Sequence, residues 1–291
     1  MNFPNVTTTS SSAASLRRGL AIVTTYAALG ALACGLWPSG WVAVPLLCGS
    51  FILSGSLNAA HDCVHATHVG KGRLNRVVGA AWCTVILINF TIYRHQHLVH
   101  HRFPGVEGDS EGHANLHTVA DYVHAQSGLG FWCAIFRRMI LTWRGQFPPS
   151  INSKKFARSA QIDNLVILSW LSIAGLLTIF WPIQLVICYW MPLLFYPMFA
   201  LFFSLPEHLD LTRIDVMWPR ARNVTSNVLV RFFQWNANYH ALHHRQPALP
   251  ACSLHRVYCD GDNLRDPAEK SYLRFHAQLI ARLWRSSPPV V

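Results

Sequence analysis

The chain has 291 residues, of which 52% are hydrophobic and 13% are charged, about half the ~25% of charged residues in an average soluble protein. This composition indicates a membrane protein. The formal net charge of +11 would also suit nucleic-acid binding, but Lys and Arg form no dense basic stripe, so we exclude nucleic acid as a partner.

Residues 1–18 form a polar segment rich in Thr and Ser, which we expect to be a disordered cytoplasmic tail. It shows no cleavable signal peptide. The chain contains eight cysteines but no CxxC pair. The cysteines therefore indicate neither a disulfide framework nor a zinc-finger or iron–sulfur site.

Four apolar stretches follow that are long enough, or nearly so, to cross a bilayer core, which takes ~20 helical residues. Very short turns join the first stretch to the second and the third to the fourth. We therefore predict an all-α integral membrane protein whose four transmembrane helices form two hairpins, at residues 19–60 and 163–205. The stretches are Leu20–Trp37, Trp41–Ala60, Leu165–Trp181 and Ile183–Leu205.

The charged residues predict the orientation of these hairpins. All of them lie in the N-terminal tail, between His61 and Asn164, or after Leu205, and the turns carry none. The positive-inside rule then places both termini in the cytoplasm, and we favour a bacterial inner membrane. Residues 61–162 and 206–291 would form a helical cytoplasmic domain.

Two further apolar runs lie between the hairpins. Val77–Tyr93 is apolar enough to be a fifth span, but crossing would carry the histidines after it to the far side, so we interpret it as an interfacial or protein-covered helix. Phe131–Trp143 is a second interfacial candidate. Near the C-terminus, Asp266 and Pro267 predict the start of an amphipathic helix. Its apolar positions are Tyr272, Phe275, Leu279, Leu283 and Trp284, and its basic ones are Arg274, Arg282 and Arg285.

Three histidine clusters with helical spacing lie in the segments assigned to the cytoplasm. Spacings of three or four residues bring imidazoles to one face of a helix, where they can bind a shared metal. Eight imidazoles exceed the needs of one ion, which implies two. Zinc would suit the set, but iron suits a membrane enzyme better because it can activate oxygen. The clusters are HDCVH (His61, His65), HLVHH (His97, His100, His101) and HALHH (His240, His243, His244).

The order of these clusters between paired spans resembles the membrane fatty acid desaturase/hydroxylase superfamily, the three-histidine-box di-iron enzymes. The resemblance runs from the first span to Leu254 and includes Asp109-Ser110-Glu111 after the second box and the run RFFQWNANYH leading into the third. It implies two iron ions as cofactors and a further ligand just after the last span, at His208. The predicted metal ligands are His61, His65, His97, His100, His101, His208, His240, His243 and His244.

Two positions depart from the family pattern. Many relatives carry Glu where Leu242 stands. Its absence would shift substrate or reactivity, unless the position is simply tolerant. The second box also has an extra histidine, His95, two residues before His97 and on a different helical face; it would be a further ligand or a hydrogen-bonding side chain.

Several polar side chains are candidates to orient the ligands. Asp62, Glu207, Asp109 and Glu111 could each accept an N–H from an imidazole, although the last two could also be solvated loop carboxylates. Asn238 could hold a metal-bound water. The other histidines lack metal-binding spacing, and we interpret them as surface or packing residues: His68, His113, His117, His124, His255 and His276.

The resemblance implies an O2-dependent oxidoreductase of lipid metabolism, and we favour a fatty acyl desaturase that forms a C=C bond by hydrogen abstraction. A hydroxylase or ketolase of an apolar substrate such as a carotenoid is the alternative, and the sequence leaves this choice open. No electron-transfer module is fused, so we expect a separate donor such as ferredoxin or a cytochrome b5-like protein. A non-enzymatic metal binder is a remote alternative, because the spans contain no His, Asp or Glu.

Overall fold

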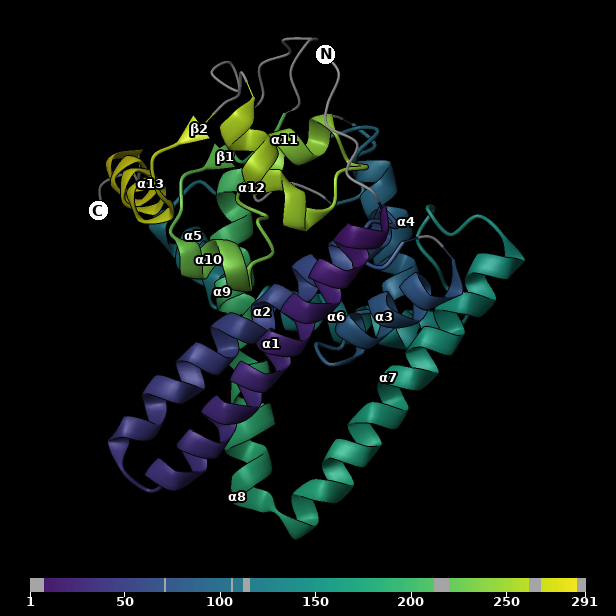
Figure 1. Cartoon of the computed structure of the whole chain (residues 1–291), viewed down its shortest axis with the longest axis vertical. Helices are drawn as coiled ribbons and strands as arrows, with labels where there is room; N and C mark the ends of the chain where they lie inside the picture. The colour runs from purple at the N-terminus through teal and green to yellow at the C-terminus, as the bar shows by residue number, and fades with distance from the viewer. Residues whose placement is uncertain are drawn as a thin grey trace, which may run out of the picture.

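The computed structural model describes residues 8–70, 72–105, 107–111, 116–211, 220–261 and 268–286, and these residues are almost entirely helical (Figure 1). Four helical segments are long and apolar enough to cross a membrane, so the protein is an integral multi-pass membrane protein, as predicted. They are Ser11–Leu36, Gly40–Val64, Lys154–Phe180 and Pro182–His208.

The four spans form the two predicted hairpins. Both hairpin turns lie at one end of the molecule (Figure 1). Three short helices lie toward the other end: α10 (Val228–Phe233), α11 (His240–Arg245) and α12 (Ala251–Asp260). The first hairpin consists of α1 (Thr8–Leu36), the 3-10 turn η1 (Gly40–Val42) and α2 (Ala43–Val64). The second consists of α7 (Lys154–Phe180), α8 (Pro182–Leu185), the π-helical turn η2 (Val186–Trp190) and α9 (Met191–His208).

The hairpin turns carry exposed tryptophans. Trp37 and Trp41 flank the first turn, and Trp181 lies in the second; they are 48%, 73% and 52% exposed. Tryptophan favours the boundary between lipid and water, where its ring meets acyl chains and its N–H meets headgroups. The turns therefore have the side chains expected at a membrane surface.

The first helix begins earlier than the sequence predicted. Residues 8–18 are helical, so the prediction of a disordered tail is wrong over this part. Packing explains the difference: the side chain of Ser15 is fully buried, and Arg18 donates hydrogen bonds to the carbonyl oxygens of Arg231 and Phe232, the latter at 2.9 Å. Contacts with a segment more than 200 residues away stabilise this start.

The apolar run Val77–Tyr93 is divided between two helices, α3 (Arg73–Thr84) and α4 (Phe90–His100). Leu87 between them has a φ of 62°, which interrupts the helix, and the side chain of Asn89 accepts a hydrogen bond from the Ile92 N–H at the start of α4. The second part of the run is covered by protein, whereas Val77 and Ala81 in the first part are exposed, so the run is both interfacial and protein-covered. The prediction of one continuous helix is wrong, and neither part is long enough to be a fifth span.

The remaining elements surround the ends of the spans. α6 (Leu129–Trp143), the predicted interfacial helix, exposes Phe136, Ile140 and Trp143 on one side. The rings of its residues Phe131 and Trp132 pack against Tyr196 of α9. The elements are α5 (Val119–Gln126), α6 (Leu129–Trp143), α10 (Val228–Phe233), α11 (His240–Arg245), α12 (Ala251–Asp260), α13 (Tyr272–Ser286) and the parallel two-residue strands β1 (Asn223–Val224) and β2 (Ala268–Glu269).

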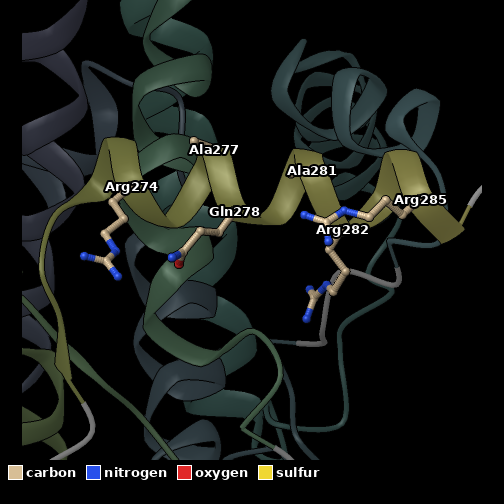
Figure 2. A pocket seen from close by; sticks show the side chains of 6 residues that line it. All are labelled: Arg274, Ala277, Gln278, Ala281, Arg282 and Arg285. Carbon is tan, nitrogen blue, oxygen red and sulfur yellow. The ribbon is translucent and has the colours of Figure 1, made fainter.

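The C-terminal helix α13 is amphipathic. Its apolar residues Phe275, Leu279 and Leu283 are buried against α5 and the end of α9. Figure 2 shows the opposite side, where arginines line a surface groove. The helix begins at Tyr272, and the predicted start at Asp266 and Pro267 lies outside the described residues. The groove arginines are Arg274, Arg282 and Arg285.

A close backbone approach places the third histidine box over the first hairpin. A Cβ atom at Gly55 of α2 would lie only 2.0 Å from the carbonyl oxygen of Phe233, at the end of α10. The neighbouring Gln234 amide donates to the carbonyl of Phe51 and the hydroxyl of Ser54 at 2.9 and 3.0 Å. Only glycine allows this approach, which fixes where the chain toward α11 begins.

Candidate metal centre

The structure brings the nine predicted metal ligands together as two groups of imidazoles. Within each group, the ligand nitrogens all lie within 4.8 Å of one another. The first group contains His61, His65, His97, His101 and His243, and the second contains His100, His208, His240 and His244.

Helical spacing explains how two short helices serve both groups. In and just after α4, His97 and His101 are four residues apart and enter the first group, while His100 enters the second. In α11 the arrangement is reversed, because His240 and His244 enter the second group and His243 enters the first. Residues four apart share a helix face, so each helix presents a pair to one group and one imidazole to the other.

The nitrogens that converge are the Nε2 atoms. In the first group, Nε2 of His61 lies 2.8 Å from Nε2 of His97, and the buried Nε2 of His65 has no hydrogen-bond partner among the described residues. In the second, Nε2 of His240 lies 2.8 Å from that of His208 and 3.1 Å from that of His244. Lone pairs directed at a common point are the arrangement that a cation completes.

Burial keeps five of these imidazoles neutral. Burial and the neighbouring imidazoles lower the pKa of His65 to about 3 and that of His101 to about 2. The same causes hold the pKa values of His240, His243 and His244 well below the usual range. Only a neutral imidazole can donate its lone pair to a metal, so these five are in the ligand form at neutral pH.

The opposite nitrogens of several imidazoles contact acceptors that fix their orientation. His100 Nδ1 lies 2.9 Å from Asp109 Oδ1, and His97 Nδ1 lies 2.6 Å from Glu111 Oε1. His208 Nδ1 lies 2.6 Å from the carbonyl oxygen of Arg220. An N–H donated from Nδ1 leaves Nε2 free toward the centre. Asp109 and Glu111 thus occupy the positions in which a carboxylate orients a ligand.

The charge of Asp109 is stabilised locally. Although burial opposes ionisation, hydrogen bonds from the backbone N–H groups of Gly105 and Glu111 and from His100 hold the pKa of Asp109 below its usual value. The pKa of Glu111 is likewise lowered, against burial, by His97. Both groups therefore remain anionic acceptors at neutral pH.

Asp62 does not contact a box imidazole, contrary to its predicted role. Its carboxylate lies 3.2 Å from Nδ1 of His68 and accepts a hydrogen bond from the Ala251 N–H at 3.1 Å and from the Thr67 hydroxyl. One residue beyond His61, it faces away from the ligand side of α2 and toward α12. Its visible role is to join these two helices.

Three other positions singled out in the sequence have clear structural roles. Asn238 donates its side-chain N–H to the carbonyl oxygen of Val224, at 2.9 Å, so this amide supports β1. Leu242 is 1% exposed and packs with residues of α12, which explains an apolar residue at that place in the box. His95 belongs to neither group, and its ring centroid lies 4.0 Å from that of Phe156.

The remaining histidines lie apart from both groups. His117 and His124 are exposed, and His255 contacts the Tyr239 hydroxyl at 2.6 Å. His276 is buried and contacts the Phe202 carbonyl at 2.9 Å, and His68 is the buried partner of Asp62. These positions agree with the predicted surface or packing roles. His113 lies outside the described residues.

A cavity of about 890 Å³ borders both groups. This volume is within the ~300–1,000 Å³ of typical ligand sites. Apolar side chains from α2, α6 and α9 form much of its wall, so the cavity joins the membrane spans to the imidazoles. It is lined by His61, His97, His100, His208 and His240 at the metal groups and by residues such as Leu57, Phe131, Ile135, Leu201 and Phe203.

The first histidine box lies at the end of its candidate membrane span. His61 follows Gly40, the start of its span, by 21 residues. At 1.5 Å per residue this is ~32 Å along the helix, just beyond a hydrocarbon core of ~30 Å. An acyl chain in the bilayer could therefore approach the groups without leaving apolar surroundings.

Comparison with known protein families identifies one match. The sequence pattern of the family described as fatty acid desaturase matches residues 19–278, which include all nine histidines. A comparison with curated proteins gives no match. The family match confirms the resemblance seen in the histidine boxes.

Proposed function

The chain belongs to the fatty acid desaturase family, and from this we propose that it is an O2-dependent membrane oxidoreductase that desaturates a fatty acyl lipid at a di-iron centre. The family implies a lipid substrate and O2. The observation that supports the proposal best is the convergence of five and four imidazoles beside an apolar cavity.

The residues fit two iron ions. Nine buried or half-buried imidazoles with lone pairs directed inward could hold them, and neighbouring carboxylates could balance part of their charge. When bound, the two irons would supply the oxidising chemistry that removes hydrogen from an unactivated C–H bond with O2. Together with two electrons and two protons from a donor, the reaction converts a CH2–CH2 unit and O2 into a CH=CH unit and two waters.

The protein's own contribution would be orientation and exclusion of water. Asp109 and Glu111 hold their imidazoles with Nε2 toward the centre. The cavity wall from α2, α6 and α9 would align an acyl chain so that two neighbouring carbons face the imidazoles. Positioning of this kind decides between removal of a second hydrogen and transfer of oxygen to carbon.

Product analysis tests the proposal. The chain would be expressed in a host with defined lipids, and mass spectrometry would locate new double bonds or oxygen atoms in acyl lipids and in added carotenoid. We expect a new C=C bond in an acyl chain. A hydroxylated or keto carotenoid as the sole product would replace the proposal with the oxygenase alternative.

We also propose that the box histidines face the cytoplasm, as the charge distribution predicts. Alkaline phosphatase is active only outside the cytoplasm of bacteria, so its insertion after Ser39 should give an active fusion. Its fusion after Ser286 should be inactive. The reverse pattern would invert the topology and move the electron donor to the other compartment.

A further inference from the structure

Glu207 approaches the second imidazole group from the metal side. Its Oε2 atom lies 3.6 Å from Nε2 of His240. The same nitrogen lies 2.8 Å from Nε2 of His208 and 3.1 Å from Nε2 of His244. The carboxylate therefore lies at the edge of the second group, beside one of its ligand nitrogens.

This position differs from the main contacts of the other two carboxylates at the site. Asp109 contacts His100 through Nδ1, and Glu111 contacts His97 through Nδ1, although its second oxygen lies 4.0 Å from Nε2 of His100. An acceptor at Nδ1 orients an imidazole from the side of the ring opposite to Nε2. Glu207 instead adjoins an Nε2 atom, where a carboxylate oxygen and a nitrogen lone pair would repel each other unless a cation or a proton lay between them.

Burial strengthens the case for a cation. The Glu207 side chain is 13% exposed, and no described residue other than His240 gives its carboxylate a hydrogen bond or an ion pair. A buried carboxylate without partners is costly, and coordination of a metal is one of the few ways to compensate it. The carboxylate also borders the cavity that reaches both groups.

The two groups are unequal, since the first has five imidazoles and the second has four. Iron sites in proteins accept mixed nitrogen and carboxylate ligands. We propose that Glu207 is a direct oxygen ligand of the ion held by the second group, so that each ion has five protein ligands. This assignment rests on the metal centre of the proposed function and makes the two ions chemically different.

The test uses the full-length protein loaded with 57Fe. Glu207→Gln should weaken binding of one of the two irons by at least about 10-fold, and should change one of the two Mössbauer doublets while the other stays in place. Glu207→Asp retains a carboxylate and should recover part of the affinity. Asp260→Asn removes an exposed carboxylate of α12 that belongs to neither group; it is the control and should leave both irons and both doublets unchanged.

The possible results separate the proposals. Two irons bound with normal affinity and an unchanged spectrum in Glu207→Gln would overturn the ligand assignment, even if the desaturase reaction were established. A wild-type protein that binds no iron would overturn both proposals. Recovery of the changed doublet by Glu207→Asp would show that the lost carboxylate, and not unfolding, caused the effect.

Discussion

At the scale of single residues, His243 shows how one side chain links distant parts of the chain. It comes from the third box but joins the first group, where its Nε2 lies 3.0 Å from Nε2 of His101. His243→Ala should abolish product formation and lower bound iron, because loss of a ligand exceeds the 10–100-fold typical of supporting residues. Mass spectrometry and iron analysis measure both. The exposed His124→Ala is the control, and retained activity in His243→Ala would contradict the ligand assignment.

The lowered pKa values of single imidazoles predict how acid affects the metal-free protein. His65 and His101 have pKa values of about 3 and about 2 when folded, against about 6.5 in an unfolded chain. Below pH 6.5 the unfolded chain therefore binds protons that the folded protein cannot bind. The free energy of unfolding should fall as the pH is lowered from 7 to 5. Denaturant titration of metal-free protein in detergent checks this; a stability independent of pH over that range would contradict it.

The clustering of the box histidines was predictable at this scale because a helix fixes which residues share a face, whereas His208 was predicted only from the family resemblance. What the neighbours of a ligand contact was not predictable in the same way. Asp62 follows His61 directly, yet its partners are the N–H of Ala251 and the ring of His68. These contacts depend on how α12 packs on α2, which no local pattern in either segment specifies.

At the scale of elements, the contact between α2 and the end of α10 predicts a strong effect of one methyl group. Gly55→Ala would place a carbon 2.0 Å from the Phe233 carbonyl, so backbone must move. We expect a loss of stability of about 1–3 kcal/mol or more, with lower iron content, because the third box would shift relative to His61. Thermal unfolding of the purified variant measures this.

Gly175→Ala provides the control, since nothing lies within 4 Å of a Cβ at that position in α7. It should leave the unfolding temperature unchanged or raise it slightly, because alanine favours the helix. Equal effects of both substitutions would show that the close approach at Gly55 does not limit stability.

Element boundaries were predictable where composition alone determines them. The four spans follow from apolar length, and the structure has all four, although two of them begin earlier than predicted, at Ser11 and Lys154 instead of Leu20 and Leu165. The division of Val77–Tyr93 was not predictable from apolarity, because it depends on the left-handed backbone of Leu87 and on the cap formed by Asn89. The early start of α1 depends in turn on Arg18 contacts to α10.

At the scale of the whole molecule, the positive charge should favour an acidic electron donor. Exposed basic side chains lie at the start of α7 and along the α13 groove (Figure 2), including Lys154, Lys155, Arg274 and Arg285. Raising salt from about 0.05 to about 0.5 M should slow donor-dependent turnover several-fold, since screening weakens long-range attraction. Reduction by a small uncharged reductant should change little. A donor-dependent turnover rate that does not change with salt concentration would contradict electrostatic steering.

The division of α11 between the two imidazole groups has a consequence for biosynthesis. Each group requires a histidine from residues 240–244, so neither can be complete until these residues have left the ribosome. Before that point the first group has four of its imidazoles and the second has two. Iron would therefore be inserted only after the residues of both hairpins have been made, and a chain truncated before Tyr239 should insert its spans yet remain without tightly bound metal.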